Sequence, residues 1–363
     1  MSSPRLERAR AIMAEAGVHA LLVGPGADLR YLVGHEAPPL ERLTLLVLPT
    51  QGRPSLVLPR LEAPMAEHAA AHVDLLAWDE TDDPVALVVD RLRAAGATAG
   101  TLAVQDRLWT MFTLALQSAL PDARWVPGST VLGELRLRKE PDEIAALHAA
   151  GAAIDRVHAQ VPDLLRPGRT EREVATELDR LIREEHDVTN FVIVGSGPNG
   201  ASPHHEAGDR RLEPGDAVVI DIGGTREGYC SDMTRDYVVG HVPEGYAQLH
   251  AVLEEAQQAA VDAVAPGVPA EAIDAAARDV IEQAGYGERF IHRTGHGIGI
   301  EEHEEPWIVA GNTRPLEPGM AFSVEPGIYV PGRYGSRIED IVVVTDSGVE
   351  RCNHRPREVV VCG

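Results

Sequence analysis

A four-residue segment that occurs twice constrains the fold of this chain more than any other feature. Residues 212–215 and 316–319 both read Leu-Glu-Pro-Gly, and each copy opens an apolar, strand-like run. An acidic residue stands nine positions after each leucine, at Asp221 and at Glu325. Core packing alone does not require a carboxylate at a matching place in two apolar runs. The repeat therefore predicts two related half-domains that face each other across one site.

Length and charge narrow the classes of protein to which the chain can belong. Its 363 residues are 44% hydrophobic, which is enough for two domains with separate cores. The net charge of −23, from 33 basic and 56 acidic residues, argues against binding to nucleic acid or to an anionic membrane. No apolar run approaches the roughly 20 residues of a membrane span, and the N-terminus leads into a charged amphipathic helix without an apolar signal core. We therefore expect a cytoplasmic protein.

The cysteines and the single lysine do not indicate a particular catalytic or metal-binding chemistry. Cys230, Cys352 and Cys362 are too few and too irregularly spaced for a disulfide framework or a thiolate metal site. Any metal ion must therefore be held by oxygen and imidazole. Lys139 is the only lysine, which we attribute to a compositional bias toward arginine and not to a function.

The first part of the chain has the pattern of an α/β layer. Apolar strand candidates alternate with amphipathic helical stretches; the strands are expected at 19–23, 43–48, 55–58 and 101–104, and the helices at 6–16 and 84–95. Between residues 125 and 142 the composition becomes charged and rich in turn-forming residues, as at an exposed boundary. We place the domain junction there, which predicts domains at 1–135 and 136–363.

In the second part of the chain, a pair of helices is followed by strands, and this pattern occurs twice. A helix is expected at 141–160, and a second begins at Thr170, where residues 170–173 form a capping-box sequence. Strands at 191–194 and 217–222 follow, then helices at 246–264 and 270–284, and then strands at 321–324 and 337–344. This order has the same internal symmetry as the repeated segment.

Residues 221–232 predict a hairpin with an aspartate on each strand. If the hairpin is symmetric about Arg226 and Glu227, Asp221 and Asp232 are direct cross-strand partners with Cβ atoms roughly 5 Å apart. Two carboxylates at this distance repel each other, and the repulsion would raise the pKa of one of them unless a cation lies between them. The pair predicts a metal ion or a shared proton; the alternative is a solvated hairpin with two unrelated acids.

Three further side chains border what should be core strands. His296 lies among the glycines of residues 295–299, Glu325 ends an apolar run, and Glu339 precedes the apolar residues 341–344. Alone, each such residue is more often a hydrogen-bonded structural group than a ligand. Together with the two aspartates they favour a metal site.

From about residue 140 to its end, the chain resembles the pita-bread metallopeptidases, the family of methionine aminopeptidase, aminopeptidase P and prolidase. The resemblance implies an α/β N-terminal domain followed by an α+β pita-bread catalytic domain with pseudo-two-fold symmetry. It also implies that five residues hold two divalent ions: Asp232 and Glu339 bridge both ions, Asp221 completes one, and His296 with Glu325 completes the other. The N-terminal domain points to the proline-specific branch.

The charge of this ligand set agrees with the resemblance. Four carboxylates balance two divalent ions, so the cluster can be buried. One imidazole among oxygen ligands is a hard ligand set. Such a set favours Mn²⁺ or Co²⁺, whereas Zn²⁺ is more typical of softer sites rich in nitrogen and sulfur. Mn²⁺ is therefore the expected ion, with Co²⁺ or Zn²⁺ as alternatives.

The resemblance also implies roles for other residues. Glu325 would accept the proton of the attacking water, while His303 would hydrogen-bond the scissile group. His204, five residues before Asp209, would line the proline pocket, with His205 as the alternative. The remaining assignments are His292 and Arg337 as supports of substrate or ligands, and Arg314 as a contact for a substrate carboxylate or else a solvent-facing turn residue. The family pattern Thr-Arg-Thr here ends in Asp236, which adds a negative charge near the site.

The expected function is a dinuclear metal-dependent Xaa-Pro dipeptidase that acts on short peptides as a homodimer. A compact N-terminal domain of about 130 residues favours the dipeptidase over its closest alternative, aminopeptidase P. A non-catalytic peptide-binding scaffold and a metal-free creatinase-like hydrolase are further alternatives. Both are disfavoured because all five ligand residues are present.

Overall fold

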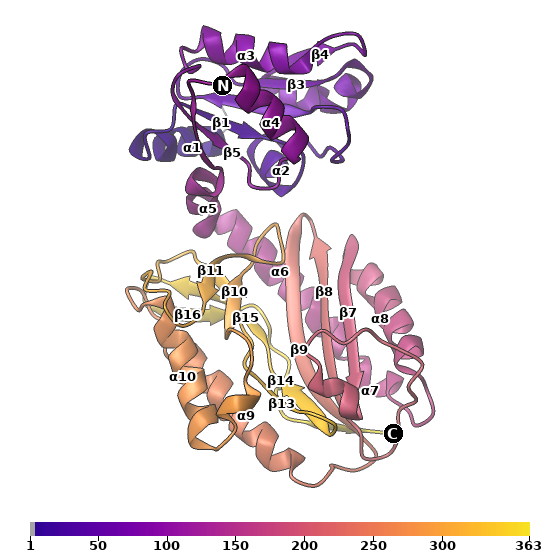
Figure 1. Cartoon of the computed structure of the whole chain (residues 1–363). Helices are drawn as coiled ribbons and strands as arrows, with labels where there is room; N and C mark the ends of the chain where they lie inside the picture. The colour runs from indigo at the N-terminus through magenta and orange to yellow at the C-terminus, as the bar shows by residue number, and fades with distance from the viewer. Residues whose placement is uncertain (1–3) are drawn as a thin grey trace. The chain divides into compact units, whose positions relative to one another are not determined.

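The chain divides into two compact units, of which the first ends at Arg136 and the second begins at Leu137. The structure is a computed structural model and describes residues 4–363. The boundary lies next to the junction expected at residue 135. Each unit is described separately below (Figure 1).

The first unit is a six-stranded sheet with helices, in the strand order β4-β3-β2-β1-β5-β6. Strands β1, β2 and β3 pair antiparallel, whereas β3–β4, β1–β5 and β5–β6 are parallel. The central strand β1 is buried along its whole length because its four residues are apolar. The strands are β1 (Ala20–Val23), β2 (Leu45–Pro49), β3 (Ser55–Pro59), β4 (Asp74–Trp78), β5 (Thr101–Val104) and β6 (Arg124–Pro127), and the helices are α1 (Pro4–Glu15), α2 (Ala27–Val33), the 3-10 helix η1 (Arg60–Ala71), α3 (Pro84–Ala94), α4 (Thr110–Ala119) and α5 (Ser129–Leu137).

The second unit begins with a helical layer against a four-stranded sheet of order β17-β9-β8-β7. Its helix α8 starts at the predicted capping box, where Thr170 and Glu173 exchange side-chain-to-backbone hydrogen bonds of 3.1 and 2.8 Å. The elements of this half are α6 (Pro141–His158), α7 (Val161–Leu164), α8 (Glu171–Glu185), β7 (Val188–Ser196), the 3-10 helix η2 (Gly197–Ala201), β8 (Ala217–Arg226), β9 (Tyr229–Val239) and β17 (Val360–Cys362).

The other half places α9 and α10 beside a five-stranded sheet of order β11-β10-β12-β15-β16 (Figure 1). A separate hairpin of β13 and β14 follows β12 and precedes β15 in the chain. The elements are α9 (Tyr246–Asp262), α10 (Ala270–Gln283), the 3-10 helix η3 (Gly287–Arg289), β10 (Gly295–Gly297), β11 (Glu304–Ile308), β12 (Ala321–Val324), β13 (Gly327–Val330), β14 (Tyr334–Arg337), β15 (Asp340–Thr345) and β16 (Gly348–Arg351).

The two halves are related through the repeated Leu-Glu-Pro-Gly segment. Gly215 and Gly319 both adopt positive φ, at 93° and 88°, which glycine permits without strain. Their amides donate to the ends of equivalent strands, to Val239 O at 2.7 Å and to Val344 O at 2.9 Å. Each half also has its own apolar cluster, one around α6 and α8 and one around α9 and α10. The internal symmetry predicted from the repeat is thus present in the backbone.

The register of the β8–β9 hairpin differs from the predicted one. Its turn is formed by Glu227 and Gly228, both at positive φ (49° and 83°), as two-residue hairpin turns prefer. Asp221 therefore lies opposite Thr234, and Asp232 lies opposite Gly223. The predicted direct pairing of the aspartates is wrong by two residues, because the turn centre was placed one residue too early. Since side chains alternate with a period of two, both carboxylates still project from the same face.

The strand predicted at residues 337–344 is also interrupted. Strand β14 ends at Arg337 and pairs with β13, whereas β15 begins at Asp340 and pairs with β12. The chain passes from one sheet to another between them. Glu339 lies at this crossing, and its amide donates to Thr234 O at 3.2 Å.

Candidate metal centre

The five candidate ligands converge from both halves of the second unit. Four of them lie on or between core strands and are 7% exposed or less, the exception being Glu325, whose side chain is 16% exposed. Asp221 lies in β8, Asp232 in β9, His296 in β10, Glu325 directly after β12, and Glu339 between β14 and β15. The site is thus built at the place where the two symmetric halves meet.

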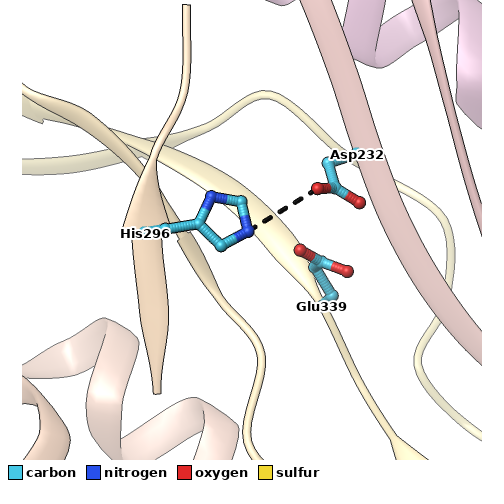
Figure 2. Close-up of side chains that lie close together, drawn as sticks. All are labelled: Asp232, His296 and Glu339. Atoms are coloured by element: carbon cyan, nitrogen blue, oxygen red, sulfur yellow. Dashed lines mark ion pairs between the residues drawn. The ribbon is translucent and has the colours of Figure 1, made fainter. Parts of the chain in front are cut away.

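Asp232, His296 and Glu339 form the centre of the cluster. One ligand atom from each lies within 4.8 Å of the others, and Figure 2 shows the three side chains pointing toward one another. The Nε2 atom of His296 is 3.8 Å from Asp232 Oδ2 and 3.1 Å from Glu325 Oε1. This spacing leaves room for a cation among the side chains.

The ring of His296 is oriented by its neighbours. Its Nδ1 atom lies 3.1 Å from Gly297 O, so a proton on Nδ1 directs the lone pair of Nε2 toward the acids. A Cβ atom at Gly295 would overlap Ser323 O, and one at Gly297 would overlap Glu305 O. The glycines on both sides of His296 therefore allow β10 to lie close enough to its neighbours for this orientation.

Two buried carboxylate oxygens have no hydrogen-bond partner among residues 4–363. They are Asp221 Oδ1 and Glu339 Oε1. The other oxygen of each carboxylate is held in place: Arg337 Nη2 donates to Asp221 Oδ2 at 2.5 Å, and Thr234 Oγ1 donates to Glu339 Oε2 at 2.8 Å. Each acid thus uses one oxygen for support and presents the other to the cluster, which is the arrangement that a metal ligand requires.

The electrostatics of the cluster also fit a bound cation. Burial, with the charges of neighbouring carboxylates, raises the pKa of Asp232 and of Glu339 well above their ordinary values. Burial also raises the pKa of Asp221, despite the nearby Arg337. Burial alone would raise the pKa of Glu325 too, but its hydrogen bond with His296 and the charge of that ring hold it at about 2. Divalent cations would remove the repulsion among these acids, so the residues present fit hard divalent ions.

Arg337 is the organising side chain around these ligands. Besides Asp221, its guanidinium donates to Tyr329 Oη at 2.8 Å, to Thr234 Oγ1 at 3.1 Å and to Pro203 O at 3.4 Å. Tyr329 Oη in turn lies 2.9 Å from His292 Nε2. Arg337 thus holds Asp221 directly, and His292 contacts Arg337 only through Tyr329.

The remaining histidines differ in their surroundings. The ring of His303 lies 4.0 Å from that of His296 between centroids, and partial desolvation of the ring, with the charges of His296, Arg293 and His204, lowers the pKa of His303 to about 4. Both His303 and His204 are exposed residues. His205 instead lies 2.8 Å from the buried carboxylate of Glu171, which makes it the structural member of the pair.

Glu171 is a site-supporting residue that the sequence analysis missed, because it was seen only as part of a helix start. Its buried carboxylate accepts hydrogen bonds from Ser196 Oγ at 2.6 Å, from Asn199 Nδ2 at 3.0 Å and from Gly208 N at 3.2 Å, besides its contact with His205. These donors lie on both sides of His204. Glu171 therefore fixes the segment that carries this histidine.

Lys139 was also underestimated. It forms a buried ion pair of 3.1 Å with Glu304, the residue that follows His303, and the two side chains are 1% and 5% exposed. The lysine thus anchors the loop that leads to β11. The signal available in the sequence was a lone lysine in a chain whose other basic residues are arginines.

Two further residues singled out in the sequence have different surroundings. Arg314 O accepts from Ala270 N at 2.9 Å, so its backbone is fixed at the start of α10, which carries none of the five ligands. Asp236 contacts Ser336 Oγ and lies 3.1 Å from His250 Nδ1. Although burial alone would lower the pKa of His250, this contact raises it. The charge of Asp236 is therefore matched locally.

Comparisons with known proteins agree with this geometry. The family model of metallopeptidase family M24 matches residues 145–346, and that of the creatinase/prolidase N-terminal domain matches residues 5–138. The chain is 52% identical to the probable dipeptidase PepE of Mycobacterium tuberculosis over 98% of this chain and 96% of that protein. It is 36% identical to an Xaa-Pro dipeptidase of Lactobacillus helveticus over 92% of each. The crystal structure of dipeptidase PepE from Mycobacterium ulcerans matches with a TM-score of 0.94 and 53% identity, covering 98% of this chain and 96% of that one.

Proposed function

Since the chain belongs to metallopeptidase family M24, we propose that it is an Xaa-Pro dipeptidase that hydrolyses the imide bond before proline in short peptides. Membership in this family confirms the resemblance to the pita-bread metallopeptidases. It also confirms the expected fold, a creatinase-type N-terminal domain followed by a pita-bread catalytic domain. The observation that carries the proposal is the pair of buried oxygens, Asp221 Oδ1 and Glu339 Oε1, that have no partner among the described residues. Relatives named as dipeptidases support the substrate class.

We assign the five converging residues to two divalent ions. Asp232 and Glu339 would contact both, Asp221 one, and His296 with Glu325 the other. Mn²⁺ suits this set, and Co²⁺ or Zn²⁺ are the alternatives. When bound, the ions polarise the scissile carbonyl and make a water molecule more acidic.

The protein side chains would position the substrate and move the proton. The carboxylate of Glu325, whose contact with His296 favours its ionised form, would accept the water's proton and pass it to the leaving nitrogen. The ring of His303 is neutral, with a pKa of about 4, and can hydrogen-bond the scissile carbonyl. His204 would line the pocket of the proline, with His292 and Arg337 as supports. Arg314 remains the residue that the family resemblance suggests for a substrate carboxylate.

The test combines removal and re-addition of the metal with activity assays on two substrates. The enzyme is treated with a chelator, dialysed, and assayed with Leu-Pro and with Leu-Pro-Gly before and after Mn²⁺ addition. The proposal expects activity only with metal, and a kcat/KM for Leu-Pro at least about tenfold above that for the tripeptide. The reverse preference would identify an aminopeptidase P. Turnover unaffected by chelation would indicate a metal-free hydrolase, and no turnover with any ion would indicate a binding scaffold.

Oligomeric state and location are further parts of the proposal. All three cysteines are buried and free, which suits the reducing cytoplasm. Among residues 4–363, no helix has the length and apolar character that crossing a membrane requires. We propose a homodimer, to be checked by light scattering coupled to size-exclusion chromatography.

A further inference from the structure

Asp236 is a buried acid on a strand that also carries a candidate metal ligand. It lies in β9 four residues after Asp232 and two after Thr234, and because side chains alternate along a strand, the three project from one face. Asp236 is 1% exposed, and it stands where the pattern Thr-Arg-Thr has its second threonine. A buried carboxylate is stable only with hydrogen-bond donors and a counter-charge around it.

The carboxylate of Asp236 holds the end of strand β14. Its Oδ1 atom accepts from the backbone amide of Arg337 at 3.3 Å, and its Oδ2 atom accepts from the hydroxyl of Ser336. These are the last two residues of β14. After them the chain crosses to another sheet through Glu339, whose amide donates to Thr234 O at 3.2 Å. Asp236 therefore fixes the point at which this crossing begins.

The counter-charge comes from His250 in α9, whose ring carries two protons. Its Nδ1 atom lies 3.1 Å from Asp236 Oδ2, and its Nε2 atom lies 2.9 Å from Arg357 O. Neither of these oxygens can donate, and the hydroxyl of Ser336, 3.2 Å from Nδ1, gives its own proton to Asp236. Both ring nitrogens must then donate, which only the imidazolium form of histidine does.

The surroundings of His250 favour this cation. Although burial opposes the charge, the hydrogen bond and the charge of Asp236, the carbonyl of Arg357 and the charge of Glu254 together raise the pKa of His250. The guanidinium of Arg357 is turned away from the ring, to the side-chain oxygens of two glutamines. Asp236 and His250 thus form a buried ion pair whose charges cancel.

We propose that Asp236 and His250 act as a positioning pair for the metal centre through Arg337. The pair fixes the backbone amide of Arg337, and the guanidinium of the same residue donates to Asp221 Oδ2 and to Thr234 Oγ1. A displaced end of β14 would move these donors away from the side chains that they hold. The inference rests on the metal centre of the proposed function and adds to it two residues that touch neither a ligand residue nor the substrate.

The protonation state of His250 is the first test. The full-length enzyme is labelled with ¹⁵N-histidine, and its side-chain resonances are recorded at pH 8, where a free histidine with a pKa of about 6.5 is neutral. The variant His250→Gln identifies the signals by their loss. We expect both ring nitrogens of His250 to carry protons in the parent, and one of them to lose its proton in Asp236→Asn. A neutral His250 ring in the parent at pH 8 would overturn the inference.

The second test measures the dissociation constant for Mn²⁺ by chelator competition, together with kcat and KM for Leu-Pro. In His250→Gln the carboxylate of Asp236 stays buried without a counter-charge, and we expect Mn²⁺ to bind about tenfold more weakly. The value of kcat should fall about tenfold while KM changes less than about threefold, since the pair does not touch the substrate. A loss of stability alone would not change these quantities in the folded protein. An unchanged Mn²⁺ affinity would contradict the positioning role.

Two further variants separate the charge of the pair from its packing. The double variant Asp236→Thr, His250→Gln removes both charges and restores the threonine of the family pattern, so it should bind Mn²⁺ within about threefold of the parent. Glu255→Gln, an exposed substitution in the same helix, is the control and should leave the affinity unchanged. A double variant that binds Mn²⁺ as weakly as His250→Gln would overturn the inference, because the ion pair would then not be what positions the centre.

The outcomes also separate this inference from the proposed function. If the parent binds Mn²⁺ but hydrolyses no Xaa-Pro peptide, the dipeptidase function fails, whereas the effect of His250→Gln on Mn²⁺ affinity still decides on the pair. If the parent hydrolyses Leu-Pro and His250→Gln binds Mn²⁺ as tightly as the parent, the pair has no positioning role while the proposed function stands.

Discussion

Arg337 Nη2 donates a 2.5 Å hydrogen bond to Asp221 Oδ2, and this contact leaves Asp221 Oδ1 as the oxygen without a partner among residues 4–363. The same guanidinium fixes Thr234 Oγ1 at 3.1 Å, which in turn holds Glu339. One buried arginine therefore orients carboxylates that come from opposite halves of the catalytic unit.

We expect Arg337→Lys to weaken both metal binding and catalysis. A lysine keeps the charge but cannot donate in the three directions that the guanidinium serves. Loss of such support around ligands lowers metal affinity or activity by about 10- to 100-fold. The measurement is the dissociation constant for Mn²⁺ from chelator competition, together with kcat/KM. Tyr329→Phe removes one of the arginine's partners and should have a smaller effect; an unchanged Mn²⁺ affinity in Arg337→Lys would contradict the role.

We expect Glu171→Gln to raise KM more than it lowers kcat, because it loosens the segment that carries His204. The amide places donor hydrogens against the donors of Ser196, Asn199 and Gly208, which should destabilise the protein by about 2–3 kcal/mol. Substrate titrations and urea unfolding measure the two effects. Glu173→Gln, an exposed substitution in the same helix turn, is the matched control and should cost less than about 1 kcal/mol. Equal behaviour of the two variants would refute the special role of Glu171.

We expect Lys139→Met to destabilise the chain by about 3–5 kcal/mol, because the buried carboxylate of Glu304 loses its lysine charge. The double variant Lys139→Met, Glu304→Gln should recover part of this loss, since no buried charge is left behind. Urea unfolding of both variants in the presence of chelator separates this effect from metal binding. A double variant that is as unstable as the single one would show that packing, and not charge, dominates at this position.

The buried His158 should make stability fall in mild acid. Burial, with the charge of Arg235, lowers its pKa from 6.5 to about 3, so the folded state keeps the ring neutral. Between pH 6.5 and 3 the unfolded chain binds a proton that the folded chain does not, so this stabilisation is complete above pH 6.5 and is lost as the pH falls. From pH 7 to pH 4.5 the loss amounts to roughly 2–3 kcal/mol.

The variant His158→Gln isolates this contribution. Its amide can still donate to Met233 O and accept from Tyr237 Oη, the two partners of the histidine, but it does not titrate. The difference in unfolding free energy between parent and variant should therefore shrink between pH 7 and pH 4.5. A constant difference across this range would mean that His158 is not the group responsible.

The sequence predicted the fold, and which acidic and imidazole side chains converge in the second unit, better than it predicted the local geometry. The repeated segment revealed the internal symmetry because glycine and proline are required wherever the turn recurs. The register of the β8–β9 hairpin was wrong because the turn forms at Glu227 and Gly228, where Gly228 accepts a positive φ without strain. Glu171 and Lys139 were missed for another reason: their roles depend on partners 25 to 165 residues away, and no local pattern shows such contacts.

The most direct measurement is anomalous X-ray scattering from crystals grown with Mn²⁺. The account predicts two anomalous peaks in the cluster, both in contact with Asp232 and Glu339, one flanked by Asp221 and the other by His296 and Glu325. The absence of any peak among these five residues, or peaks that touch neither Asp232 nor Glu339, would contradict the central claim that the two halves of the unit hold a shared metal centre.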